Sequence, residues 1–360
     1  MKTTELKKAF GERLRRARLM RGLTLREVAM RLAAAGKKLS HAALQKYEQG
    51  LMGPDSGMLI ALCEVFGLDT GYFFRQRSIR LENVDFRKRT AFPVKDENRV
   101  REEALDAFER YLEIETILEL EAPPLPRYAL DVATLADDAE AAAASLRDQW
   151  KLGEDALPNV TEMLEEHGVK VKEVVAAKSF DGCSGWANET MPVIVLAEGL
   201  NEDLPRKRFT ALHELGHLVL QFPEDLTKKE VESLCHRFAS AMLIPTAAMK
   251  ARLGVKRPDG ISFAEMKSLK VDWGISLAAL MYRAGDLGII TPSRLKSFQF
   301  THRTKGWHRK EPGEWCGTER ANRFTQLVHR AAAQELITRA KAAELLEMTH
   351  REFDHSFAAA

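Results

Sequence analysis

The sequence predicts a multidomain protein with an all-α N-terminal domain of five short helices, a mainly helical α+β domain with a small sheet, and a helical C-terminal region. Short apolar patterns of helical spacing, preceded by capping residues, fill residues 1–76. The proline-rich run 122–126 is a stiff break in the chain. Three runs beyond it read as strands by their β-branched content and alternation: 169–175, 183–187 and 192–196. We therefore expect four parts: 1–76, 77–126, 127–290 and 291–360.

The N-terminal part carries the signals of five helices in close succession. A first helix over residues 10–20 turns Leu14 and Leu19 inward, and its arginines are expected to face outward: Arg13, Arg16 and Arg18. Thr24 with Glu27 forms a capping box, and Ser40 is a second N-cap. The four following helices are expected at residues 25–32, 41–49, 55–66 and 69–73.

Positive charge is concentrated in this part. Residues 1–76 hold 14 lysines and arginines against 7 acidic residues, a formal charge of +7, whereas the whole chain carries +2. Such an excess favours a polyanionic partner, although a solvated basic helix face would give the same count.

Two spaced patterns identify the kind of domain. Thr24-x-x-Glu27-x-Ala29 and a later Leu-x-x-Tyr-Glu-x-Gly over residues 44–50 resemble the Xre/Cro-type helix-turn-helix family, although the turn at 33–39 is longer than usual. The resemblance implies that double-stranded DNA is the partner and that helix 41–49 enters its major groove. The alternative is a module that binds only another protein. The residues expected to contact DNA are Arg26, Lys37, Lys38, Ser40, His41, Ala42, Gln45 and Lys46.

A basic connector with Arg and Lys at 87–89 is expected over residues 77–95, followed by a charged helix over 96–120. An apolar stripe at three-to-four spacing runs along this helix and includes Leu105, Phe108 and Leu112. The stripe either packs on the domain that follows or pairs with a second copy to form a homodimer.

The run 206–220 contains His213-Glu214-Leu215-Gly216-His217, an H-E-x-x-H pattern inside an apolar helix. Residues four apart lie on one helix face, so His213 and His217 can offer two imidazoles to one metal ion. Glu214 lies close enough to accept a proton from a water molecule at that ion. A buried helix whose histidines are only hydrogen-bonded is the alternative.

A catalytic zinc usually has three protein ligands. The next helical pattern, residues 229–245, offers Glu232 as the third, with His236 four residues later as the group that orients it. His236 itself and Cys235 are rival ligands.

Together these runs resemble the ImmA/IrrE family of metallopeptidases. The resemblance rests on RKRFTALHELGH, on E-x-x-C-H-R-F-A-x-x-x-L-I-P, and on FDGCSGW at 180–186, and it covers about residues 140–290. It implies a zincin-like fold, one Zn²⁺ per chain at His213, His217 and Glu232, and Glu214 as general base. It also implies regulatory cleavage of a helix-turn-helix repressor, which switches on stress, phage or mobile-element genes. Many relatives have Asp or Asn where this chain has His236.

The remaining sequence is less informative. The segment 270–284 resembles the family's closing helix pair, 291–317 is expected to be irregular, and two helices are expected at 322–336 and 340–353. The chain has no apolar run of about 20 residues and no secretory signal, and its four cysteines are widely spaced, so we expect a cytoplasmic protein without a membrane segment. Two other functions remain open: a non-proteolytic transcriptional regulator and a toxin–antitoxin component, in which the peptidase-like domain senses a ligand or partner.

Overall fold

The computed structural model describes residues 3–75, 79, 81–82 and 93–359. The predicted basic run at 87–89 lies outside these residues. Five short helices form the N-terminal domain, as expected: α1 (Thr3–Met20), α2 (Leu25–Ala34), α3 (His41–Glu48), α4 (Ser56–Phe66) and the 3-10 helix η1 (Gly71–Phe74). The predicted caps are present, because the Thr24 hydroxyl accepts from the Glu27 amide and the Ser40 hydroxyl from the Ala43 amide. Leu14, Leu32 and Leu62 lie in the small core of the domain.

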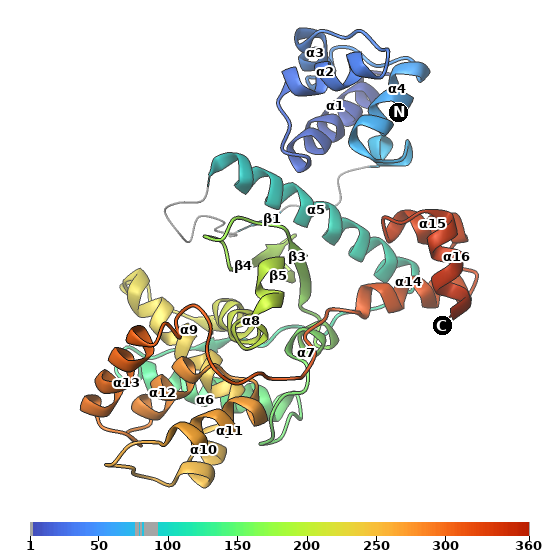
Figure 1. The fold of residues 1–360 in the computed structure, drawn as a ribbon. Coiled ribbons are helices and arrows are strands. Elements are labelled where there is room, and N and C mark those ends of the chain that lie inside the picture. Colours follow the sequence, from blue (N-terminus) through green and yellow to red (C-terminus); the bar gives the residue numbers. More distant parts are fainter. Residues whose placement is uncertain (1–2, 76–78, 80, 83–92, 360) are drawn as a thin grey trace.

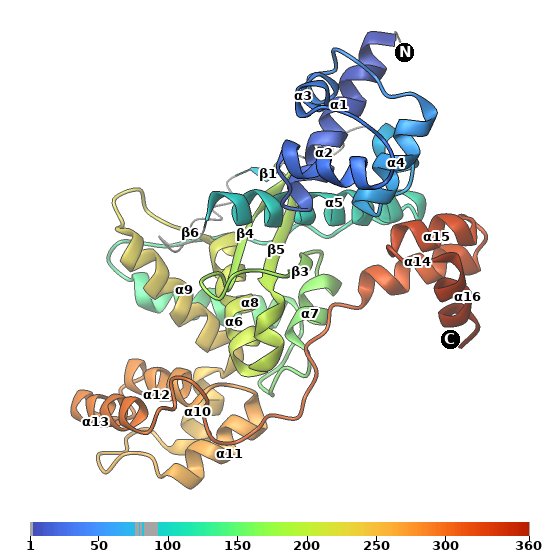
Figure 2. The same ribbon diagram turned by 45° about the horizontal axis from the view of Figure 1, so that its top comes forward.

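The long helix α5 (Val94–Ile117) is the element that joins the parts of the molecule. Both views show the N-terminal domain on one side of α5 and the sheet on the other, with the last helices of the chain at its C-terminal end (Figures 1 and 2). Its apolar stripe is covered within one chain: Leu105 and Phe108 belong to the core that surrounds the sheet. The stripe therefore does not require a second copy to bury it.

The arginines of α1 differ from the prediction. Arg13 and Arg16 are only 2% and 8% exposed, and both donate to the Glu109 carboxylate of α5, over 2.6 and 2.8 Å. Arg18 pairs with Glu48 inside its own domain. The outward positions of α1 were assigned from helical spacing alone, which cannot reveal that an acidic helix from another part of the chain covers them.

The main sheet has the strand order β1-β4-β5-β3. Its strands are β1 (Leu81–Glu82), β3 (Lys170–Val174), β4 (Gly182–Ala187) and β5 (Met191–Ala197). β3 runs parallel to β5, whereas β4 is antiparallel to both β5 and β1. The central strand β5 is buried at nearly every position because α5 lies over one face of the sheet and α8 (Leu204–Val219) over the other.

A second helical layer lies beyond α8. In a short parallel pair, β2 (Tyr128–Ala129) lies beside β6 (Leu220–Gln221), the strand that directly follows α8. Helix α9 packs between α8 and α6, and α12 packs against α9. The helices of this layer are α6 (Leu135–Gln149), α9 (Lys228–Leu243), α10 (Thr246–Leu253), α11 (Phe263–Trp273) and α12 (Leu277–Asp286), whereas α7 (Val160–Glu166) packs against β3 and α8.

The C-terminal part contains more helix than predicted. Residues 292–304, expected to be irregular, form α13 (Pro292–Thr304), which Thr291 caps and a proline begins. The expected final helix at 340–353 is two helices, because Glu347 adopts a left-handed conformation (φ 55°) between them. The last three helices are α14 (Arg323–Ala333), α15 (Arg339–Leu345) and α16 (His350–Ala359), and they share a core with the end of α5.

Candidate metal centre and nucleic-acid interface

The two histidines of the H-E-x-x-H pattern stand together on α8. This helix begins after Asp203, whose carboxylate accepts from the Arg206 amide, and Pro205 occupies its first turn. His213 and His217 are one turn apart, with their rings 4.9 Å apart and their Nε2 atoms 3.2 Å apart. Two imidazole nitrogens therefore point to one place, as the spacing predicted.

Helix α9 brings Glu232 to the same place. Its Oε2 lies 3.0 Å from Nε2 of His213, and its Oε1 lies 3.4 Å from Nε2 of His217. The two helices approach closely because Gly216 has no side chain: a Cβ there would lie 3.2 Å from Cδ1 of Phe238. The rival Cys235 is buried against this glycine and belongs to no candidate metal cluster found in the described residues.

The three side chains suit a zinc ion. Nitrogen and oxygen ligands about 2.0–2.2 Å from zinc in a tetrahedral arrangement lie roughly 3.4 Å from one another. The separations between His213, His217 and Glu232 are 3.0, 3.2 and 3.4 Å. Glu232 is 43% exposed, so this side of the cluster is open to solvent. Hydrogen bonds from the two histidines hold the pKa of Glu232 far below its usual range.

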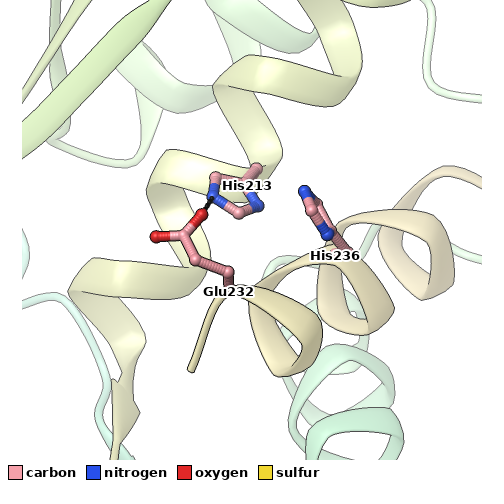
Figure 3. Close-up of side chains that lie close together, drawn as sticks. All are labelled: His213, Glu232 and His236. Atoms are coloured by element: carbon pink, nitrogen blue, oxygen red, sulfur yellow. Dashed lines mark hydrogen bonds and ion pairs between the residues drawn. The ribbon is translucent and has the colours of Figure 1, made fainter. Parts of the chain in front are cut away.

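His236 occupies a different position from the predicted one. Its ring centroid lies 4.6 Å from that of His213, and no hydrogen bond joins it to Glu232 in the described part of the chain. Figure 3 shows Glu232 beside Nε2 of His213 and His236 on the opposite side of that ring. Potential ligand atoms of His213, Glu232 and His236 also lie within 4.8 Å of one another. The distances within the His213, His217 and Glu232 set are shorter, and so we assign that set as the candidate site.

The residues predicted to contact DNA lie on one exposed part of the N-terminal domain. Leu44 and Tyr47 of α3 are buried, whereas its other predicted contacts are exposed: His41, Ala42, Gln45 and Lys46. Arg26 is exposed in the first turn of α2, and Lys37, Lys38 and Ser40 are exposed in the turn before α3. This arrangement presents the start of α3 to solvent, as a recognition helix requires.

Family models match both regions. Residues 9–71 match a helix-turn-helix domain, and residues 164–284 match the IrrE N-terminal-like domain of a peptidase family. The chain joins a helix-turn-helix domain to an IrrE N-terminal-like domain. It is thus a DNA-binding regulator with a metallopeptidase-type domain. No curated protein matches the chain.

The match to the IrrE N-terminal-like domain begins in α7 and ends in α12, so it contains the sheet strands β3 to β5 and both helices of the histidine–glutamate cluster. Helix α5 and the helices after α12 lie outside the matched residues. Among the helices of the described residues, none has the length and apolar character to cross a membrane.

One contact within the IrrE N-terminal-like domain was not foreseen. The Ser184 hydroxyl of β4 donates a 2.7 Å hydrogen bond to Oε2 of Glu214, and both residues are buried. The sequence placed Ser184 only on a strand near the active helix. The FDGCSGW run was the sequence feature that marked Ser184, but a local motif does not predict a contact with Glu214, 30 positions later in the chain.

Proposed function

We propose that this protein is a zinc-dependent regulatory endopeptidase that also binds DNA. The observation that carries the proposal is the convergence of the His213, His217 and Glu232 ligand atoms within 3.4 Å, with Glu214 next to His213 on the same helix. In this proposal the three side chains hold one zinc ion. His236, which faces the Nδ1 side of His213 in Figure 3, keeps that ring in its orientation.

A zinc ion held by His213, His217 and Glu232 would supply Lewis acidity, to polarise a scissile carbonyl and to lower the pKa of a water molecule. Glu214 takes the proton from the attacking water and delivers it to the amide nitrogen as the carbon–nitrogen bond breaks. The Ser184 hydroxyl, which donates to Oε2 of Glu214, fixes the direction of this carboxylate. Desolvation by the surrounding side chains, followed by the charge of His213, lowers the pKa of His236 to about 4, so this ring is neutral at pH 7 although the residue is exposed.

The proposed substrate is an extended segment of a protein, a helix-turn-helix repressor or the chain itself. Strand β4 supports this idea, because Ser184 brings it beside the proposed base. Among the described residues, β1 pairs with Trp186 and Ala187 of β4 and not with Ser184. An extended peptide added to β4 next to Ser184 would run past Glu214 by β-augmentation. This proposal includes a cytoplasmic location, because a DNA-bound repressor would be the substrate.

The test of the metal site is the zinc content of the purified protein, measured by elemental analysis. We expect about one zinc per chain in the wild type and its loss in His217→Ala and Glu232→Ala, because each variant removes one of three protein ligands. Lys229→Ala is the matched control, since it replaces an exposed residue of α9 that is not one of the candidate ligands. Wild-type protein that takes up no zinc would contradict the proposal, and zinc retained by Glu232→Ala would shift the third ligand to His236.

The test of the chemistry is Glu214→Gln. We expect this variant to keep its zinc and to lose at least about 100-fold in cleavage rate, because glutamine cannot transfer the proton. Repressors encoded beside the gene serve as candidate substrates, with the products identified by mass spectrometry. Equal cleavage by wild type and Glu214→Gln would end this mechanism. Zinc binding without cleavage of any protein would favour a sensing role for the domain.

A further inference from the structure

A cavity lies where the first turn of α5 meets the N-terminal domain. Its volume is about 840 Å³, and residues of both parts line it, among them Arg26 and His41 from the helix-turn-helix domain and Lys95 and Asn98 from α5. Gly22, in the turn between α1 and α2, lies against side chains of α5: a Cβ on it would lie 3.5 Å from Cδ of Arg99 and 3.6 Å from Cε of Lys95. The start of α5 is thus beside the starts of the two helices that face DNA in this type of domain.

Positive groups gather around this cavity. Arg26 and Lys95 are exposed, and neither forms a hydrogen bond or ion pair within the described part of the chain. Helices α2 and α3 also begin at this cavity, where Leu25 and His41 follow their N-caps, so their partial positive ends face it as well.

The negative groups nearby are already engaged or lie elsewhere. The Glu27 carboxylate accepts a hydrogen bond from the Thr24 amide in the capping box, and this bond is the main reason that the pKa of Glu27 is lowered. The charge of Lys95 lowers the same pKa by a smaller amount. Asp96 and Glu97 of the same turn of α5 are not among the residues that line the cavity. Arg18, which also lines the cavity, forms an ion pair with Glu48.

We propose that α5 extends the DNA-binding surface of this protein, with Lys95 contacting a backbone phosphate beside the one that Arg26 contacts. These two neighbouring phosphates neutralise cations from two parts of the chain, and neither cation has a hydrogen-bond or ion-pair partner among the described residues. Such contacts position a recognition helix without reading bases. The inference rests on the proposed DNA binding by α3. It adds a contact outside the residues that match the helix-turn-helix domain.

The contact also joins DNA to the rest of the molecule. Further along α5, Glu115 pairs over 2.6 Å with Lys170 of strand β3, which is buried. One rigid helix therefore touches both the proposed phosphate site and the sheet of the IrrE N-terminal-like domain.

The experiment measures binding of the full chain to a fluorescent DNA duplex of mixed sequence, by anisotropy, between about 50 and 200 mM salt. Each lost phosphate contact lowers the slope of log Kd against log salt by about 0.9. We expect that reduction for Lys95→Ala and for Arg26→Ala. Lys95→Arg should keep the wild-type slope because it keeps the charge.

Lys250→Ala is the matched control, an exposed lysine on α10 outside the cavity, and should leave the slope unchanged. A wild-type slope in Lys95→Ala, together with a reduced slope in Arg26→Ala, would overturn the role of α5 and leave DNA binding by the helix-turn-helix domain intact. A wild-type protein whose affinity does not change with salt would overturn both the role of α5 and the proposed DNA binding by the helix-turn-helix domain.

Discussion

The Ser184 hydroxyl donates a hydrogen bond directly to the carboxylate of the proposed general base, Glu214. A hydrogen bond to a charged group contributes roughly 1.5–3 kcal/mol, and here it fixes a carboxylate that must reach both water and a leaving amine. We expect Ser184→Ala to lower kcat for repressor cleavage about tenfold, with KM little changed. Ser184→Thr, which keeps the hydroxyl, should recover most of the rate.

Zinc content and unfolding midpoint are the controls for this variant, since both should match the wild type if Ser184 acts only on Glu214. A loss of zinc in Ser184→Ala would instead assign Ser184 to the stability of the metal site. Full activity in Ser184→Ala would remove it from the proposed catalytic machinery.

For single residues, the sequence predicts those side-chain positions that depend only on spacing along one helix. The four-residue spacing of His213 and His217 predicted two imidazoles on one face of the helix, and in the structure their Nε2 atoms lie 3.2 Å apart. The position of His236 was not predictable in the same way. Whether it faces Glu232 on its own helix or His213 on α8 depends on how α9 is rotated against α8, and packing around Gly216 decides that.

Helix α5 is held against the N-terminal domain by ion pairs between residues that are distant in sequence. Glu109 accepts from both Arg13 and Arg16, and all three side chains are buried. Replacing it by glutamine removes the carboxylate that two buried guanidinium groups share, while Arg16 keeps its ion pair with Glu102. We expect Glu109→Gln to lower the free energy of unfolding by roughly 3–5 kcal/mol, as measured by denaturant titration.

Glu12→Gln is the control for Glu109→Gln, because Glu12 is exposed on α1 and its replacement should change stability by less than about 0.5 kcal/mol. Equal effects of the two substitutions would show that the buried pairs contribute nothing to the docking of the N-terminal domain.

Helix α7 carries a carboxyl group that makes stability depend on pH. Burial raises the pKa of Glu165 to about 7, against a partly opposing hydrogen bond from the Arg323 amide at the start of α14. Tyr111, Lys170 and the Arg323 side chain also face it. The folded state therefore holds a proton that the unfolded chain, with a pKa near 4.5, has already released.

The free energy of unfolding should consequently fall as the pH rises from about 4.5 to 7, because the folded state binds more protons over that range. Glu165→Gln should remove this part of the pH dependence, which is measured by denaturant titration at several pH values. An identical pH dependence in wild type and variant would show that Glu165 ionises normally in the folded protein.

For the whole molecule, the sequence predicted the kinds of domain but not how they join. The amphipathic pattern of α5 predicted packing either on the domain that follows or on a second copy. In the structure, α5 contacts the N-terminal domain, the sheet of the following domain and the C-terminal helices. Helix α13 was missed because its face is mostly polar and exposed, so apolar periodicity gave little signal. The break at Glu347 was missed because no glycine or proline marks it.

The shared burial of Arg13, Arg16 and Glu109 has an evolutionary consequence. Helix-turn-helix domains are easily exchanged between genes when a flexible linker alone joins them to their partners. Here an incoming domain without basic residues at these two positions would leave Glu109 buried and unpaired. This buried contact therefore limits which DNA-binding domains can replace the present one. A replacement domain would need basic residues at the positions of Arg13 and Arg16.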